Sequence, residues 1–405
     1  MALIVQKYGG SSAGDAERIK DIARRAVAIK EKDNKVVIVV SAMGDSTDEL
    51  LSLAHQITSQ PDERELDFLL STGEIVSSTL LAMALKALGH SAISLSGSQA
   101  GIQTDNTHSA ARIRAIDPQR ITRELDKGKV VVVAGFQGVT EDLDITTLGR
   151  GGSDTTAVAL AVSLGADVCQ IYTDVDGVYT ADPRLVPEAR KLKEIDYEEM
   201  VELATYGFRV MHPRAVEIGQ IFSMPIYVAS SFSDNVGTVI RGGIPMEVRN
   251  KVRGIAHDPN VAKVTVQAVA DRPGIASAIF EPLAKANVSV DTIVQNASVD
   301  GITDLTFTVA RDDVPRALKV MEPIAKSIAA KGCVVDSDLG KVSIVGTGMQ
   351  NTPGYAARMF RALSDAGINI ELITTSEIRI TCIVSRDRVA DAVRALHKAF
   401  DLDQE

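Results

Sequence analysis

The chain has 405 residues, of which 45% are hydrophobic and 24% charged, which is typical of a soluble globular protein large enough for two or three domains. Its net charge of −10, with no dominant basic patch and no Trp, argues against a nucleic-acid surface. Residues 1–5 lack a signal-peptide pattern, and no apolar run approaches membrane-spanning length, so we expect a cytoplasmic protein without a nucleic-acid or membrane partner. Cys169, Cys333 and Cys382 are far apart and predict reduced thiols rather than a metal site.

Short β-branched runs alternate with longer helical patterns over residues 1–240. The expected strands lie at 3–6, 36–41, 92–95, 130–134, 168–173 and 226–228. A helix expected over 15–30 places its apolar residues on one face. The alternation predicts an α/β fold with three α/β/α layers, in which helices cover both faces of a mostly parallel sheet.

Polar, glycine-rich runs follow four of these strands, at 7–12, 41–45, 134–138 and 173–177. Ligands of such sheets bind beyond the carboxyl ends of the strands, so the four runs predict one site. Lys7, followed by Gly9 and Gly10, could hold phosphoryl oxygens there, although a solvated lysine is the commoner case. The chain has neither a G-x-x-x-x-G-K-[ST] motif nor a G-x-G-x-x-G after the first strand, which excludes a P-loop and weakens a dinucleotide interpretation.

The run Leu148-Gly149-Arg150-Gly151-Gly152-Ser153-Asp154 precedes a small apolar helix. Backbone N–H groups at a helix start, reached through glycines, accept a carboxylate or a phosphate. An ordinary strand-to-helix turn is the alternative for this run taken alone.

The pattern changes near residues 241–245, and the remaining chain repeats itself at an offset of 80 residues. Pro273-Gly274 matches Pro353-Gly354, and apolar matches such as Phe280 with Phe360 continue the repeat. Each copy predicts a strand (263–269; 341–345), a Pro-Gly turn, a helix, a further strand (288–293; 368–374), and then another strand and helix, the last over 388–399. The tail therefore predicts two α+β, ferredoxin-like domains.

These runs, together with Ser71-Thr72-Gly73-Glu74, 173–179, 181–184 and Met211-His212-Pro213-Arg214, resemble the amino-acid kinase family. Within that family they are similar to its aspartate kinase branch, and the tail resembles paired ACT domains. The resemblance covers essentially the whole chain and implies an amino-acid kinase domain at 1–245 and ACT domains at 263–340 and 341–405.

The chain departs from the family's usual residues at two places. Tyr8, Ser11 and Ala13 stand where Phe, Thr and Val are usual, and these changes keep the ring and the hydroxyl. Arg209 stands where a Lys is usual, which keeps the cation but leaves the role of Arg209 open.

The resemblance implies phosphoryl transfer from ATP, with Mg²⁺, to the side-chain carboxylate of L-aspartate, the first step of lysine, threonine and methionine biosynthesis. That carboxylate is already ionised at pH 7, so the reaction needs positioning and charge neutralisation rather than a general base. Lys7 and Asp154 are the implied catalytic residues. The implied aspartate-binding residues are Ser41, Thr47, Glu74, Arg150, Gly151, Gly152 and Ser153, and the implied nucleotide-binding residues are Lys7, Tyr8, Gly9, Gly10, Thr173, Asp174, Tyr179, Asp182 and Arg184.

Several of these assignments have simpler alternatives. The alternative for Glu74 is a solvated charge on a helix, for Arg150 a surface ion pair, and for Asp182-Pro183 a turn. Ser71 and Thr72 are expected to pack rather than to bind a ligand, and His212 is expected to be structural.

The tail resembles a regulatory module that binds lysine, threonine or both between its ACT domains. The candidate effector-binding residues are Asp271, Ile275, Gln295, Asn296, Thr352, Pro353, Thr374, Ser376 and Glu377. A dimerisation module without a ligand is the alternative. We expect a homo-oligomer, or an α2β2 assembly whose small regulatory subunit starts internally at Met246.

Two other functions are alternatives to that of an aspartate kinase. The first is an amino-acid-sensing protein with an inactive kinase domain, which the presence of Lys7, Glu74, Arg150 and Asp154 together argues against. The second is a kinase for glutamate, N-acetylglutamate, carbamate or a nucleotide, which the ACT-like tail and the run at 71–74 argue against.

Overall fold

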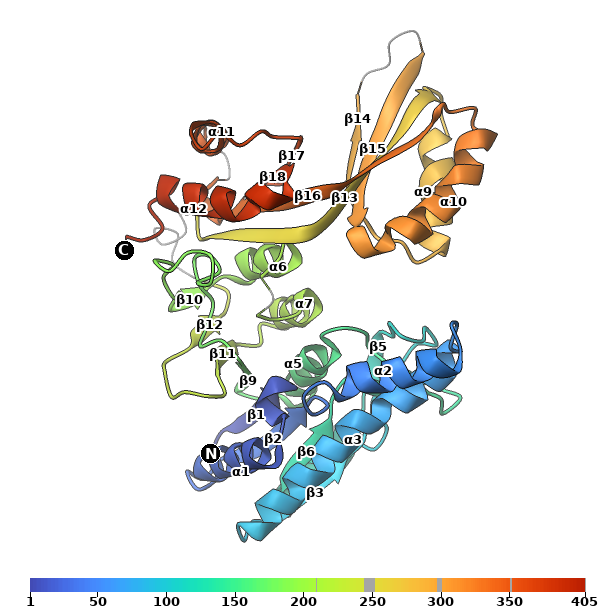
Figure 1. Ribbon diagram of the computed structural model, residues 1–405. Coiled ribbons are helices and arrows are strands. Elements are labelled where there is room, and N and C mark those ends of the chain that lie inside the picture. Colours follow the sequence, from blue (N-terminus) through green and yellow to red (C-terminus); the bar gives the residue numbers. More distant parts are fainter. Residues whose placement is uncertain (209, 244–251, 297–300, 350–351, 405) are drawn as a thin grey trace. The chain divides into compact units, whose positions relative to one another are not determined.

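The computed structural model describes residues 1–405 apart from 209, 244–251, 297–300, 350–351 and 405 (Figure 1). The chain divides into two compact units. The first comprises Met1–Tyr179 and Lys191–Val248, and the second comprises Thr180–Arg190 and Arg249–Glu405. A short segment that lies within the first unit in sequence, Thr180–Arg190, therefore belongs to the second unit in space.

An eight-stranded sheet forms the centre of the first unit, in the order β10-β12-β11-β9-β1-β2-β6-β3. Its neighbouring strands are parallel except for β11 and β12. The strands are β1 (Leu3–Tyr8), β2 (Lys35–Val40), β3 (Ala92–Leu95), β6 (Val130–Ala134), β9 (Val168–Thr173), β10 (Glu194–Ile195), β11 (Ile226–Ser230) and β12 (Thr238–Ile240). The mostly parallel sheet and all six expected strands are thus confirmed, with small differences at their ends.

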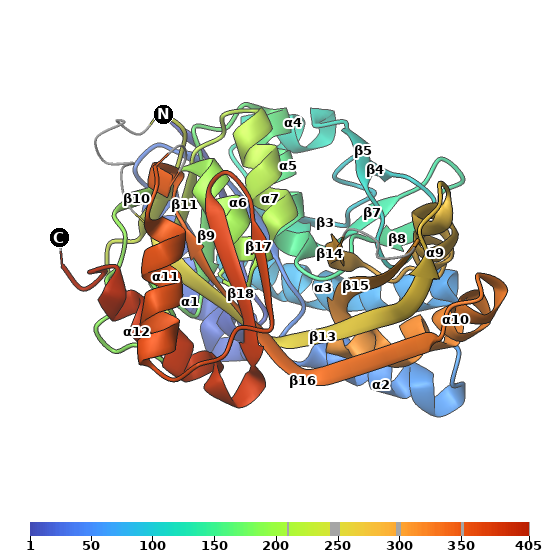
Figure 2. The same ribbon diagram turned by 90° about the horizontal axis from the view of Figure 1, so that it is seen from above.

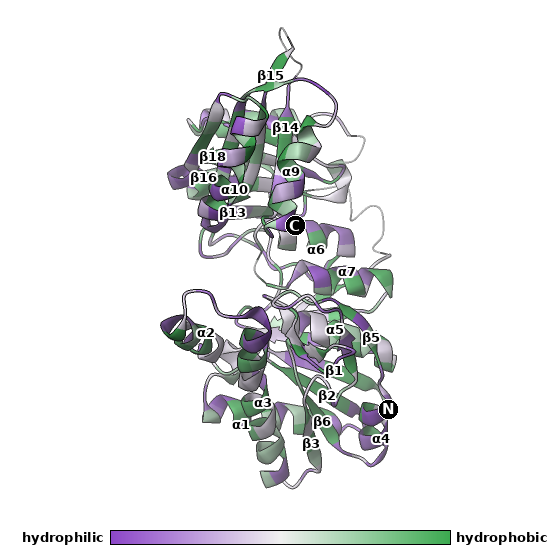
Figure 3. Ribbon diagram, turned by 90° about the vertical axis from the view of Figure 1, so that its right-hand side faces the viewer, coloured by the Kyte–Doolittle hydropathy of each residue, from purple (hydrophilic) through white to green (hydrophobic). Residues whose placement is uncertain are grey.

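Helices cover both faces of this sheet. On one face, α1 (Ala16–Lys30) and α3 (Glu63–Ala87) lie side by side and pack on Val36, Ile38 and Val40 of β2 (Figure 1). The alternate residue Val39 faces the start of α5 (Gly152–Leu164), which contacts β1, β2 and β9. Because both faces are covered, β2 and β6 consist almost wholly of Val and Ile, and they are green in Figure 3.

The first unit also contains elements that lie outside the central sheet. A second sheet has the order β5-β4-β7-β8, a feature that the sequence patterns do not predict. Its strands are β4 (Ile102–Thr104), β5 (Ile113–Ile116), β7 (Gln137–Val139) and β8 (Ile145–Thr147). The remaining helices are α2 (Ser46–Ile57), α4 (Gln119–Asp126), α6 (Tyr197–Thr205) and α7 (Pro213–Ile221).

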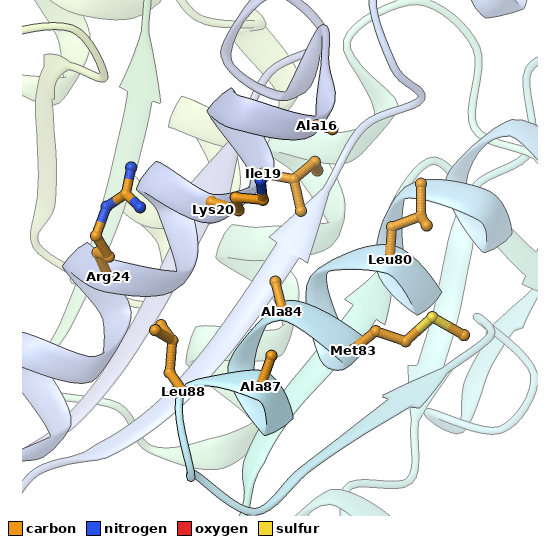
Figure 4. Close-up of a pocket in the computed structure, with 9 residues that line it drawn as sticks. All are labelled: Ala16, Ile19, Lys20, Arg24, Leu80, Met83, Ala84, Ala87 and Leu88. Carbon is orange, nitrogen blue, oxygen red and sulfur yellow. The ribbon is translucent and has the colours of Figure 1, made fainter.

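Helix α3 is more apolar than expected. Among the described residues it is the one helix with the length and mean hydropathy, 1.6 over 18 residues, of a membrane span, which corrects the expectation that no apolar run approaches that length. Half of this window is buried inside the structure, and the inner face of α3 carries the buried carboxyl groups of Asp67 and Glu74. Its outer face borders an apolar groove of about 380 Å³ against α1, lined by Ile19, Leu80 and Met83 among others (Figure 4).

The second unit is built on a six-stranded antiparallel sheet in the order β14-β15-β13-β16-β18-β17 (Figure 2). Its strands are β13 (Gly254–Ala270), β14 (Val290–Gln295), β15 (Ile302–Ala310), β16 (Gly332–Val345), β17 (Leu372–Thr375) and β18 (Arg379–Ser385). Its helices are α9 (Ile275–Lys285), α10 (Val314–Ser327), α11 (Tyr355–Asp365) and α12 (Val389–Ala399). Helices α9 and α11 match residue for residue at the repeat offset of 80, and the glycine before each has a positive φ, +92° at Gly274 and +108° at Gly354.

The two repeats share their long strands. Residues 263–267 of β13 pair with 332–336 of β16, while residues 254–258 pair with 341–345. The first half of β13 therefore completes the sheet of the second repeat, and β16 runs without a break through residues 340 and 341. The two α+β repeats form one continuous sheet rather than two separate sheets.

Candidate active site

The four polar loops of the first unit lie along one edge of the sheet. They follow β9, β1, β2 and β6, which are consecutive parallel neighbours, so their carboxyl ends point the same way. The loops after β1 and β2 touch, since the Gly44 N–H donates to the Gly10 carbonyl at 3.1 Å. A Cβ at Gly10 would lie 3.0 Å from the carbonyl oxygens of Ala42 and Gly44, so this approach favours glycine. The predicted single edge is confirmed.

An ion pair joins Lys7 and Asp154 at this edge. Lys7 lies near the end of β1 and Asp154 in the first turn of α5, and Nζ is 2.6 Å from Oδ1. The other oxygen, Oδ2, accepts the His212 N–H at 3.1 Å. Both side chains keep a little exposure, 12% for Lys7 and 10% for Asp154, so the ammonium is fixed by Asp154 and can still meet a ligand.

Glu74 lies on the inner face of α3 and is only 3% exposed, so the solvated-charge alternative is wrong. Its Oε1 accepts the Ala42 N–H at 3.0 Å, whereas the buried Oε2 has no hydrogen-bond partner among the described residues. Burial raises the pKa of Glu74 to about 7, against the hydrogen bond from Ala42. A buried carboxylate oxygen without a donor is the kind of group that a ligand's cation satisfies.

The loop between β8 and α5 presents Arg150 to solvent. Gly149 and Gly151 flank it with positive φ angles of +76° and +71°, a conformation that favours glycine. Within the described part of the chain no side chain pairs with the Arg150 guanidinium, so a surface ion pair is not what the structure shows. Ser153, in the next turn, is 6% exposed.

The other predicted aspartate-binding residues lie near the same edge. Ser41 directly follows β2 and Thr47 is the second residue of α2, and both are half-buried. Ser71 and Thr72 donate their hydroxyls to carbonyls one turn earlier, at 2.8 and 2.7 Å, which is the packing role expected of them.

Several of the nucleotide-binding candidates already make contacts within the protein. The Tyr8 ring is 1% exposed and stacks on Tyr172 in the core at 4.8 Å between centroids, so only its main chain can face a ligand. Thr173 and Asp174 lie at the end of β9, where the Thr173 hydroxyl donates to the Asp174 carboxylate at 3.0 Å. Tyr179 donates its hydroxyl to Asp176 at 2.7 Å.

Asp182 and Arg184 lie in the segment that belongs to the second unit. The segment closes as a hairpin, because Tyr179 pairs with Lys191 and the Thr180 N–H donates to the Arg190 carbonyl at 2.9 Å. The Asp182 carboxylate accepts from the Arg184 guanidinium at 2.7 Å. This is the turn that the simpler alternative describes, and a nucleotide contact by either residue stays a prediction.

Sequence reasoning missed Asp67. This carboxylate is fully buried and receives donors from two segments, one of them next to the Arg150 loop. The available signal was its spacing of seven residues from Glu74, which places both on the same face of one helix.

The effector-binding candidates lie at corresponding places in the two repeats. Asp271, Thr352 and Pro353 are exposed just before α9 and α11, whereas Ile275 is 6% exposed and packs in the core, so only its main chain is available. The candidates on the strands lie in or just after the edge strands β14 and β17: Gln295, Asn296, Thr374, Ser376 and Glu377. Met246 and Arg209 lie outside the described residues.

Comparison with known proteins agrees with this architecture. The amino acid kinase family matches residues 2–230, and the ACT domain matches residues 264–325 and 342–400. An aspartokinase of Mycolicibacterium smegmatis is 51% identical over 408 residues, covering 99% of this chain and 97% of that protein. An aspartokinase of Corynebacterium glutamicum is 50% identical over 411 residues, covering 100% of this chain and 97% of that protein.

Solved structures show the same fold. Aspartate kinase from Synechocystis is 45% identical with a TM-score of 0.55, covering 99% of this chain and 70% of that one. Aspartokinase III from E. coli, solved with aspartate and ADP, has a TM-score of 0.82 at 23% identity, covering 98% of this chain and 100% of that one. The chain therefore belongs to the amino acid kinase family. Within it the chain belongs to the aspartokinases, ATP-dependent kinases that here carry two C-terminal ACT domains.

Proposed function

We propose that the enzyme transfers the γ-phosphoryl group of MgATP to the β-carboxylate of L-aspartate and so forms 4-phospho-L-aspartate. The observation that supports this best is the buried Oε2 of Glu74, which has no hydrogen-bond partner among the described residues. Glu74 is bonded through Oε1 to Ala42 in the loop after β2, at the edge that also carries the Lys7–Asp154 pair. An amino-acid acceptor brings the ammonium group that Glu74 lacks. The E. coli relative was solved with aspartate and ADP, which agrees with this pairing of ligands.

The reaction asks for charge neutralisation and positioning. The acceptor carboxylate is ionised at neutral pH and attacks the γ-phosphorus directly, while ADP leaves, so no proton has to be removed. Lys7 stabilises the negative charge on the transferring group, and Asp154 holds the Lys7 ammonium in place. Mg²⁺ enters as part of the MgATP substrate, held by phosphate oxygens.

The two charged groups on the α-carbon of aspartate are each held by a side chain of opposite charge. Glu74 accepts the α-ammonium, and the Arg150 guanidinium pairs with the α-carboxylate through two parallel N–H donors. Ser41, Thr47 and Ser153 supply hydroxyls for the reacting carboxylate, and the loop amides of Gly151 and Gly152 complete this side. On the nucleotide side we assign the main chain of Tyr8, Gly9 and Gly10 and the side chains of Thr173, Asp174, Tyr179, Asp182 and Arg184.

Acceptor specificity tests the proposed function. Because Glu74 and Arg150 fix the distance from the α-carbon to the phosphoryl group, we expect ADP release with aspartate and at least about 100-fold less with glutamate, whose carboxylate is one methylene further away. A coupled ADP-release assay measures both rates. An enzyme that turns over glutamate equally well would contradict the assignment of the acceptor.

We further propose that lysine, threonine or both inhibit the enzyme from the ACT repeats. The support is the hairpin at 180–190, which packs as part of the second unit: Ala181 and Val186 lie in the core with α12, and the Thr180 hydroxyl lies 2.9 Å from Nε2 of His397. Its stem continues into the first unit at Tyr179 and Lys191, both bonded to Asp176. The chain itself thus links the second unit to the segment that we propose binds the nucleotide.

Titration of lysine and threonine, singly and together, tests this regulation. An effector that binds the inactive state more tightly shifts the population towards that state, so we expect ADP release to fall with lysine, with threonine or with both. By linkage, if the effector weakens the binding of a substrate, that substrate weakens the binding of the effector by the same factor. D-lysine at the same concentrations serves as the control for ionic effects. Unchanged rates with both amino acids, alone and combined, would contradict the regulatory proposal.

We propose a homo-oligomer for the whole chain. The edge strands β14 and β17 carry Ile293 and Ile373, which are 53% and 43% exposed, and such edges pair readily with a second copy. The α2β2 arrangement and the cytoplasmic location remain predictions from the sequence.

A further inference from the structure

The turn that opens α7 lies against the two ends of the Arg150 loop. His212 caps α7, since its Nδ1 accepts the Arg214 N–H at 3.3 Å, and its own N–H donates to Asp154. The His212 side chain covers Gly151, where an added Cβ would lie 2.5 Å from the His212 Cβ. The far end of the loop is thereby fixed to the turn.

The near end of the loop is held by the Arg214 guanidinium. Its NH1 group donates to the Leu148 carbonyl at 2.9 Å and its NH2 group to the Ala111 carbonyl at 3.0 Å. One planar cation thus joins the residue just before the loop to the neighbouring segment at 108–111. The same two segments also bond directly, from the Ala111 N–H to the Thr147 carbonyl at 2.9 Å.

Asp67 holds the same two segments through groups of the opposite polarity. Its carboxylate accepts the Thr147 N–H at 3.0 Å, the Thr147 hydroxyl at 2.5 Å and the Ser109 N–H at 3.0 Å, and it lies 2.9 Å from Nδ1 of His108. A cation therefore binds the carbonyl oxygens of these segments, and a fully buried anion binds their amides.

We infer that Asp67 and Arg214 are positioning residues that hold the main chain of the loop carrying Arg150. Arg150 stands between two glycines and has no side-chain partner among the described residues, so the backbone anchors of the loop decide where its Cα lies and from where its guanidinium can reach a ligand. Asp67 and Arg214 supply those anchors at Thr147 and Leu148. The inference rests on the proposed function, in which Arg150 binds the α-carboxylate of aspartate.

Substitution of Arg214 tests this role. We expect Arg214→Met to raise the KM for aspartate about tenfold, with the KM for ATP changed less than about twofold, because the loss falls on the aspartate loop. Arg214→Lys is expected to recover part of the loss, since one ammonium can reach one of the two carbonyls. Arg123→Met, at an exposed position on α4, is the matched control and should behave as wild type.

A double-mutant cycle separates positioning from general destabilisation. If Arg214 acts through Arg150, Arg214→Met changes the KM for aspartate less than about twofold in an Arg150→Met background. An equal, multiplicative loss in both backgrounds, or no change in the wild-type background, would overturn the inference. Asp67→Asn, which puts an amide donor against the loop amides, is expected to show the same pattern and gives a second variant should Arg214→Met not fold.

The Arg150→Met variant alone shows whether the proposed function itself has failed. It should raise the KM for aspartate at least about tenfold, because it removes the forked contact. An unchanged KM would reject the aspartate contact, and with it the basis of the inference. A raised KM for Arg150→Met beside an unchanged KM for Arg214→Met would reject only the positioning role.

Discussion

Replacing Lys7 with alanine is expected to lower kcat by about 10³-fold while the protein stays folded. The ammonium lies 2.6 Å from Asp154 at the strand-end edge, and no other lysine belongs to the Lys7-Tyr8-Gly9-Gly10 run. The chemistry has no general base to lose, so the charge on the transferring phosphoryl group carries most of the expected cost. Steady-state ADP release at saturating aspartate and ATP measures the effect.

Lys35→Ala is the matched control for Lys7→Ala. Lys35 also lies on a parallel strand of the same sheet and pairs with an aspartate, Asp126, at 2.8 Å, but it stands at the amino end of β2. Its loss should leave kcat within about twofold, because an exposed ion pair contributes little. We expect Lys7→Ala to stay folded, because Asp154 still accepts the His212 N–H when Lys7 is gone. Circular dichroism checks the fold of both variants. A folded Lys7→Ala enzyme with near-normal kcat would show that Lys7 is not catalytic.

Glu74→Gln is expected to raise the KM for aspartate about 100-fold, because a charge-assisted contact in a buried site is lost. Gln keeps an acceptor for the Ala42 N–H, so the loop is retained, but it presents an amide donor to the incoming ammonium. The KM for ATP should change little. Equal losses for both substrates would instead indicate a general defect of the site.

The same carboxyl group predicts how aspartate binding depends on pH. With its pKa near 7 in the free enzyme, Glu74 is protonated below pH 7 and must lose that proton before it can accept an ammonium. Aspartate affinity should therefore be constant from about pH 8 up to the pH at which aspartate loses its α-ammonium proton, and fall towards tenfold per pH unit below pH 7. Calorimetry in buffers of different ionisation enthalpy should detect proton release on binding at pH 6.5, and Glu74→Gln should abolish it. A flat affinity between pH 6 and 8 in the wild type would contradict the role of Glu74.

The sequence predicts the central sheet well because its strands are covered on both faces. Runs such as Val130–Ala134 are then continuously apolar and bounded by polar loops, so the sequence shows where each strand lies and that the strands run parallel. The short strands β4, β5, β7 and β8 have three or four residues each, too few to show a period. Sharing of β13 and β16 between the repeats is likewise invisible in the local sequence, since the pairing joins residues 65 to 91 apart in the chain.

In the candidate site, too, the local sequence predicts some features, and others depend on tertiary contacts. The motifs named Lys7, Glu74, Arg150 and Asp154, and the structure brings the ion pair and the buried carboxylate to one edge. The supports of these residues were not predictable in the same way. Asp67 and the hairpin at 180–190 acquire their roles only from what folds against them, and a residue type alone does not reveal a tertiary partner.

Trapping of the product tests the central claim most directly. An acyl phosphate reacts with hydroxylamine to give a hydroxamate, whereas hydrolysis of ATP gives none, so the assay reports where the phosphoryl group goes. We predict one equivalent of hydroxamate for each ADP released with aspartate, and almost none with glutamate. ADP formed without hydroxamate, or no ADP at all from the folded wild-type protein supplied with MgATP and aspartate, would contradict phosphoryl transfer to the aspartate carboxylate.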